Sequence, residues 1–217
     1  MANTKFEDVH GKQGVVIQAE TSVELRSTTE AKLLFVLAKE RLLDVNNWQN
    51  LTGNLYANFQ LTDQNAAKLY GPAMQGNLIQ IDIPGPGARH GKGFDWVRVE
   101  QINQYIQENT ESISIVVRPA SSPLSQIDGV THFYASQATS TFTLTKINNI
   151  VTALIYDKNL KPNMVAETNM ERIRNAVVGA AAILVFSKLQ WKRLTNGLLR
   201  FTDSALTTDN LKPNGEY

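Results

Sequence analysis

Three side chains that could bind or transform a small molecule lie in one segment of alternating sequence, residues 94–106. Trp96, Arg98 and Glu100 share one side of this segment if it is a strand, because side chains alternate across a strand. If that side faces the interior, the two charges are buried and need partners: each other, water or a ligand. Apolar walls with a few placed polar groups are what a small-molecule site requires.

The opposite orientation of the same segment is the alternative. Val97 and Val99 then face the core, and Arg98 with Glu100 forms a solvated pair on the surface. The two orientations differ by one position in the alternation. The sequence therefore gives two interpretations of this strand, one with a ligand site and one without.

A second group of such residues lies in residues 132–146. His132, Tyr134 and Phe142 share one side of this segment, and threonines occupy the other, where they suit the solvent face of a strand. The histidine and the tyrosine could serve as acid, base or ligand contacts. The alternative is that each is partly buried and makes one structural hydrogen bond.

Stronger catalytic or metal-binding patterns are absent from the sequence. The three histidines, His10, His90 and His132, lie in separate segments without metal-ligand spacing, and the chain has no cysteine. No serine occupies a G-x-S-x-G elbow. The sequence thus predicts no catalytic residue, no metal site and no cofactor.

The segment 84–93 has the composition of a phosphate-binding loop, with glycines among Arg89, His90 and Lys92. A phosphate loop has to open a helix, so that amides and helix dipole converge on the anion. The residues that follow are strand-like instead. We therefore expect a hairpin loop at the mouth of a cavity, with an anion site or a gating loop as the alternative.

Composition narrows the partners and the compartment. The chain has 217 residues and a net charge of +1, which does not favour binding along a phosphate backbone, so nucleic acid is not expected as a partner. The absence of cysteine fits a reducing compartment, and the first residues lack a signal-like apolar stretch, so we expect a cytoplasmic location. One domain is expected over residues 13–201, between a flexible start (1–12) and a loosely ordered tail (202–217).

The periodicity of the chain predicts an α+β protein. Ser27 and Glu30 have the spacing of a capping box and open a helix. Its mostly apolar stripe consists of Leu33, Leu34, Leu37, Arg41 and Val45. Seven segments are strand-like and form an antiparallel meander: residues 15–25, 55–61, 77–83, 94–106, 112–118, 132–146 and 150–156.

A long apolar helix is expected at the end of the chain, from about residue 168 to 200, opened by a second capping box. Its apolar centre, residues 176–186, is too short to cross a bilayer, which needs about twenty such residues. We interpret it as a helix buried on most of its circumference, with an interfacial membrane helix as the alternative. The sequence leaves the oligomeric state open.

The order of these elements resembles the START/Bet v 1-like (SRPBCC) helix-grip superfamily. The resemblance covers roughly residues 13–200 and includes a helical segment that ends in a tryptophan, residues 44–48. It implies a curved antiparallel sheet of about seven strands wrapped around the C-terminal helix, with a cavity between them for a hydrophobic molecule. The single clear helix between the first two strands is a departure from the two short helices common in that superfamily.

We therefore expect a carrier or sensor of a hydrophobic, lipid-like or aromatic small molecule rather than an enzyme. The predicted cavity lining is Trp96, Arg98, Glu100, His132, Tyr134, Phe142, Ile173, Val177, Ala181 and Leu184. Two alternatives stay open: an enzyme of the aromatase/cyclase or hydrolase kind on the same scaffold, and a filled domain that acts through its surface or as an oligomer.

Overall fold

The computed structural model describes residues 14–53, 56–83, 94–125, 129–161, 163 and 170–201, with side chains from residue 184 onward in the last helix. The predictions for residues 1–12, 84–93 and 202–217 lie outside these ranges. The elements are β1 Val15–Glu24, α1 Thr28–Leu43, η1 Val45–Asn47, α2 Trp48–Thr52, β2 Asn58–Thr62, β3 Leu78–Asp82, β4 Asp95–Gln107, β5 Thr110–Pro119, β6 Thr139–Ile147, β7 Ile150–Leu160 and α3 Met170–Leu198.

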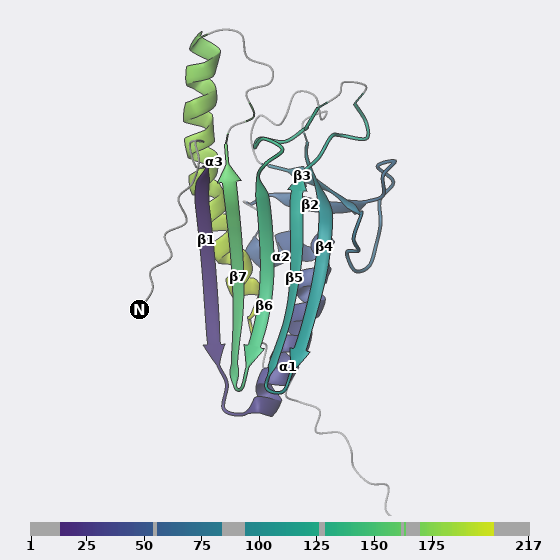
Figure 1. Cartoon of the computed structure of the whole chain (residues 1–217), viewed down its shortest axis with the longest axis vertical. Helices are drawn as coiled ribbons and strands as arrows, with labels where there is room; N and C mark the ends of the chain where they lie inside the picture. Colours follow the sequence, from purple (N-terminus) through teal and green to yellow (C-terminus); the bar gives the residue numbers. More distant parts are fainter. Residues whose placement is uncertain are drawn as a thin grey trace, which may run out of the picture.

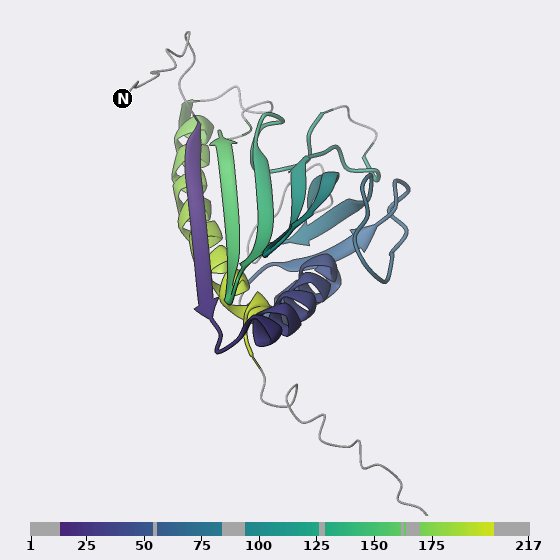
Figure 2. The ribbon, with the colours of Figure 1, turned by 60° about the horizontal axis from the view of Figure 1, so that its bottom comes forward.

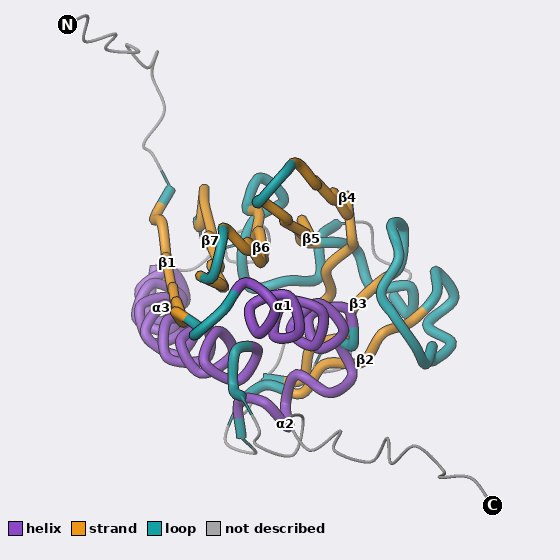
Figure 3. Tube along the Cα trace, turned by 90° about the horizontal axis from the view of Figure 1, so that it is seen from below, coloured by secondary structure: helices purple, strands orange, loops and turns teal. Residues whose placement is uncertain are grey.

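The strands form one antiparallel sheet in the order β1-β7-β6-β5-β4-β3-β2. The first strand therefore lies beside the last, and the strands between them follow the chain as a meander. The sheet is curved (Figure 1, Figure 2), and the helices lie on one side of the arc of strands (Figure 3). This arrangement confirms the α+β class and the helix-grip fold that the sequence resemblance implied.

Helix α1 covers one end of the concave face. The Ser27 hydroxyl accepts a hydrogen bond from the Glu30 backbone N–H at 3.1 Å, which confirms the predicted cap. Its buried face differs from the predicted stripe, since Leu33 is exposed. The side chains that this face packs against the sheet are Ala31, Leu34, Phe35, Ala38 and Leu42.

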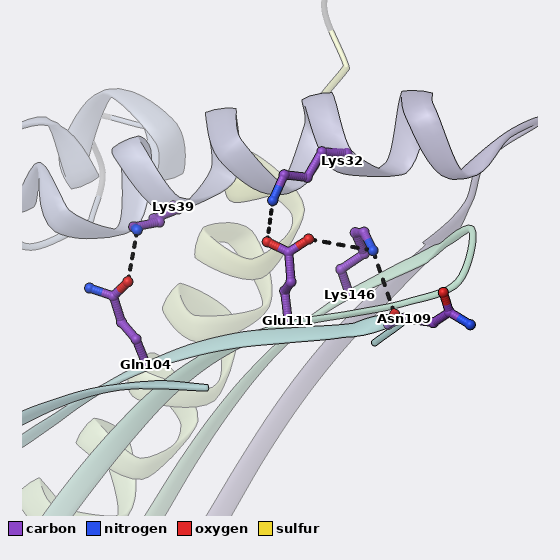
Figure 4. Close-up of polar contacts among 6 residues, drawn as sticks. All are labelled: Lys32, Lys39, Gln104, Asn109, Glu111 and Lys146. Atoms are coloured by element: carbon purple, nitrogen blue, oxygen red, sulfur yellow. Dashed lines mark hydrogen bonds and ion pairs between the residues drawn. The ribbon is translucent and has the colours of Figure 1, made fainter. Parts of the chain in front are cut away.

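Charged side chains fasten α1 to the sheet (Figure 4). The Glu111 carboxylate on β5 pairs with Lys32 of α1 and with Lys146 of β6, whose Nζ lies 3.6 Å from Glu111 Oε1. We call these three residues the charge triad. Outside the triad, Lys39 donates to Gln104 Oε1 on β4 at 2.9 Å. Two members of the triad are largely buried, with exposed fractions of 8% for Lys146 and 13% for Glu111, whereas the Lys32 side chain is 51% exposed.

A β-bulge in β4 decides which side chains face the interior. The register between β4 and β5 shifts between Val99 and Gln101, so Glu100 is an extra residue. Before the bulge, Val97 and Val99 belong to the main core; after it, Ile102 packs against that core. The inward side chains of β4 are therefore odd-numbered before Glu100 and even-numbered after it.

Helix α3 runs along the other side of the concave face and packs against β1, β7 and α2. Gly197 allows the close approach to α2, because a Cβ there would lie 2.7 Å from the Leu51 Cβ. Leu194 and Leu198 are fully buried in the core. Within the described residues, no helix has the length and hydropathy needed to cross a membrane.

Candidate functional site

A cavity lies between the concave face and α3, beyond the part of the sheet that α1 covers. The volume open to the centre of a water-sized sphere is about 70 Å³. Four aromatic side chains contact one another along its wall. The ring centroids are 5.2 Å apart for Trp48 and Phe59, 4.8 Å for Trp48 and Phe142, and 5.2 Å for Phe142 and Trp191. The cavity therefore has a rigid aromatic side.

Aliphatic side chains and a few polar groups complete the lining. The aliphatic members are Ala57, Ile79, Ile81, Ile83, Val97 and Val117. The remaining lining residues are Asp95, His132, Phe133, Tyr134, Ser140, Asp157, Phe186, Ser187 and Gln190. Apolar walls with convergent polar groups are the usual composition of a small-molecule site.

Asp95 opens β4 and lines the cavity, with only 4% of its surface exposed. Its Oδ1 atom is buried and has no hydrogen-bond partner. Burial raises the pKa of Asp95 to about 7, and a hydrogen bond from the Phe133 backbone N–H only partly offsets this effect. The carboxyl thus keeps one acceptor that no donor of the described protein satisfies.

Asp157 repeats this arrangement near the end of β7, where it is 2% exposed and lies opposite Ser140 of β6. The Trp191 indole N–H donates to Asp157 Oδ2 at 2.7 Å, whereas Oδ1 has no partner. Burial raises the pKa of Asp157 to about 6, although Ser140 and Trp191 act in the opposite direction. One oxygen is held by the protein, and the other is free.

Tyr134 and His132 come from the loop that precedes β6. Burial raises the pKa of Tyr134 to about 12, the nearby Ser187 lowers it, and Asp157 and Asp95 raise it further. Its hydroxyl makes no hydrogen bond of normal geometry, although the Ser187 side chain lies close enough to lower its pKa. The Tyr134 backbone N–H donates to His132 Nδ1 at 2.9 Å, and burial lowers the pKa of His132 to about 4, so the ring is neutral.

The structure divides the predicted lining residues into those at the cavity and those elsewhere. His132, Tyr134 and Phe142 line it, while Leu184 packs beside Tyr134 in a neighbouring apolar cluster. The side chains of Ile173, Val177 and Ala181 lie outside the described part of α3.

Trp96, Arg98 and Glu100 lie on the other side of the sheet. Trp96 is fully buried there, in a cluster with Leu78 and Ala120. Arg98 is exposed, and Glu100 pairs with Arg118 at 3.9 Å across a largely solvated surface. The physical reason is the parity of β4, whose inward residues before the bulge are Asp95, Val97 and Val99 rather than the even positions.

Two functional candidates, Asp95 and Asp157, were missing from the sequence interpretation. The sequence does carry a signal for Asp157, because Val151, Ala153 and Ile155 are buried at alternate positions of β7 and the next residue in this series is Asp157.

The described residues contain no group of three His, Cys, Asp or Glu side chains that could hold a metal ion.

Comparisons with known proteins give distant structural matches. The sequence matches no protein-family model and no curated protein. A protein from Mycobacterium smegmatis is similar at 14% identity over 88% of this chain and 98% of its own, with a TM-score of 0.38. Truncated norcoclaurine synthase from Thalictrum flavum matches at 11% identity, 82% and 98% coverage and a TM-score of 0.33. Major latex-like protein 151 from Panax ginseng matches at 10% identity, 80% and 97% coverage and a TM-score of 0.31.

Proposed function

We propose that this protein binds a small, mainly apolar molecule in the cavity between the sheet and α3, as a carrier or sensor. The observation that carries the proposal is the presence of buried polar atoms without partners, Asp95 Oδ1, Asp157 Oδ1 and Tyr134 OH, in an aromatic-walled cavity. Native interiors leave few such atoms unsatisfied. A bound molecule with a polar end would satisfy them while its apolar part contacts the rings.

The size of the cavity limits the class of ligand. The cavity volume of about 70 Å³ is several times the roughly 10–15 Å³ that one water needs on this measure. This space suits a molecule of one or two rings better than a long-chain lipid. We therefore favour the aromatic member of the two ligand classes expected from the sequence.

An enzyme is the second candidate, and one observation favours it. Asp95, with its pKa near neutrality, lies in a cavity with Tyr134 and could exchange a proton with a bound molecule. This assignment differs from the enzyme that the sequence left open as an alternative, since Arg98 and Glu100 do not line the cavity. Incubating an identified ligand with the protein and looking for chemical change separates an enzyme from a carrier.

The direct test is native mass spectrometry of the protein purified from its own host, followed by solvent extraction. A stoichiometric small molecule is the expected result. Val117→Phe should remove it, because Val117 lines the cavity and the larger ring fills the space. Val116→Phe is the matched control, since Val116 lies next to it on β5 and points to the other face.

A mass equal to that of the protein without ligand would not test weak binding. Mass spectrometry is therefore combined with titration of the purified protein with candidate ligands. Two of the three tryptophans, Trp48 and Trp191, line the cavity and report binding by fluorescence. If one-ring and two-ring compounds change this fluorescence equally in Val117→Phe and in the wild type, the cavity is not the binding site and the proposal fails.

A further inference from the structure

We infer that the ligand carries a cationic group, a protonated amine, which Asp95 and Asp157 bind. The inference rests on the proposed function, because it names the chemical class of molecule for the same cavity. Three observations carry it: the charge of the described cavity lining, the way each carboxyl is held, and the aromatic wall of the cavity.

The described lining of the cavity contains negative groups and no positive ones. Among the described residues that line it, the acidic side chains are Asp95 and Asp157, and no lysine or arginine is present. Both aspartates are more than nine-tenths buried. Isolated carboxylates in apolar surroundings are costly, and a cation inside the cavity is the partner that offsets this cost most directly.

The protein fixes each carboxyl by one side and leaves the other side free. Trp191 holds Asp157 Oδ2, and the Phe133 backbone N–H bonds the carboxyl of Asp95. The unused atoms are Oδ1 of both residues. Tyr134 lines the same cavity as both carboxyls. A protonated amine has three donors, which matches these three free polar atoms.

The aromatic wall suits the same ligand. Trp48, Phe59, Phe142 and Trp191 line the cavity, and ring faces attract cations as well as apolar groups. A carboxylate or phosphate ligand meets repulsion from the two aspartates instead. A neutral alcohol could bond one free oxygen, but it offers one donor and no charge.

The test uses two matched series of compounds. The one-ring series is 2-phenylethylamine, 2-phenylethanol and 3-phenylpropionate, and the two-ring series has 1-naphthyl in place of phenyl. Binding is followed by tryptophan fluorescence and calorimetry at pH 7.5. We expect the amine of at least one series to bind about tenfold or more tightly than its alcohol, because charge-assisted hydrogen bonds are the stronger ones, and the carboxylate to bind weakest.

Variants then locate the charge selectivity. Asp95→Asn and Asp157→Asn should each reduce amine affinity about tenfold and change alcohol affinity less than about threefold, since only the amine depends on the charge. Asp82→Asn, on the exposed end of β3, is the matched control and should leave all affinities unchanged. Circular dichroism verifies that each variant is folded.

The outcomes separate the two proposals. If, in every series that binds, the alcohol or the carboxylate binds as tightly as the matching amine, the inference about charge is overturned and the proposed function stands. If none of the six compounds binds the wild type, both are overturned for ligands of this size. The ranking in the wild type decides the inference even where a variant fails to fold.

Discussion

Two polar clusters with buried acidic groups lie at opposite ends of the same concave face, and they differ in whether their charges are paired. At the α1 end, Glu111 lies between Lys32 and Lys146, and Lys146 also reaches the Asn109 carbonyl at 3.5 Å. At the cavity end, each aspartate leaves one buried oxygen without a partner. The row of inward side chains on β6 connects them, from Lys146 in the triad to Ser140 at the cavity.

The difference follows from what covers each end. Helix α1 brings a long basic side chain over the sheet, so the acid beneath it is satisfied within the protein. The described lining of the cavity end is mostly rings and aliphatic groups, and it contains no lysine or arginine that could neutralise a carboxylate. A satisfied cluster holds elements together, whereas an unsatisfied one in a cavity is free to bind something else. Neutralising one acid in each cluster should therefore change stability in opposite directions.

Glu111→Gln should destabilise the protein most, by about 3 kcal/mol, because it leaves Lys146 charged and buried without its counter-ion. The measurement is the free energy of unfolding in urea at pH 7. Glu20→Gln, an exposed change on β1, is the control and should cost little. Replacing both members, as in Glu111→Leu with Lys146→Met, should recover much of the loss. A double variant as unstable as the single one would contradict the role given to the triad.

Asp95→Asn should instead stabilise the protein, by about 2 kcal/mol at pH 8, because it removes a carboxylate that burial disfavours. Urea unfolding at several pH values measures this effect, with Asp82→Asn as the exposed control. A loss of stability at pH 8 in Asp95→Asn would show that the Asp95 charge is satisfied in the empty protein, and the contrast between the clusters would disappear.

The sign of the pH dependence follows from the folded pKa of Asp95, about 7. In the unfolded chain an aspartate loses its proton near pH 4. Between these values the folded state holds the extra proton, so stability falls as pH rises and is flat above pH 7. Asp157 likewise lowers stability as the pH rises to about 6. His132 instead raises stability as the pH rises from about 4 to 6.5, because its folded pKa is the lower one. The gain in free energy of unfolding of Asp95→Asn over the wild type should therefore be near zero at pH 4 and should grow as the pH rises to about 7.

The sequence predicted the order of the elements better than the facing of individual residues. Alternation and the capping box at Ser27 identified the strands and α1, because these signals are local. The bulge at Glu100 has no such signal, since neither glycine nor proline marks it, and it reverses the inward parity of β4. The sequence left both orientations of this strand open, and the predicted lining residue Trp96 lies on the other side of the sheet because the inward residues before the bulge are the odd ones.

The loop before β6 shows a second limit. Residues 132–138 alternate like a strand, but their backbone bonds go elsewhere: the Ala135 N–H donates to the Lys161 carbonyl and the Ala138 N–H to the Ala135 carbonyl. The predicted residues His132 and Tyr134 still reach the cavity, from a loop rather than a strand. The pairing of Trp191 with Asp157 joins residues far apart in the sequence, so no local pattern could reveal it.

Trp191→Phe tests whether the hydrogen bond from the Trp191 indole supports the charge of Asp157. We expect the free energy of unfolding to fall by about 1.5 kcal/mol at pH 8 and by less at pH 5. The reason is that the hydrogen bond stabilises the charged carboxylate most, so that losing the bond raises the pKa of Asp157 further. Trp48→Phe is the matched control. Its indole donates to the Leu42 carbonyl at 3.1 Å, so its cost should not depend on pH. Equal pH dependence in the two variants would contradict this assignment.

The smallest effect is expected for the contact that resembles the triad in position but not in burial. Lys39 donates to Gln104 from α1 to β4, beside the triad but exposed to solvent (Figure 4). Lys39→Met should therefore change the free energy of unfolding by less than about 0.5 kcal/mol, since exposed polar contacts contribute little. The same urea measurement used for Glu111→Gln gives the comparison. A loss in Lys39→Met as large as in Glu111→Gln would mean that helix attachment itself, rather than the pairing of a buried charge, makes the triad important.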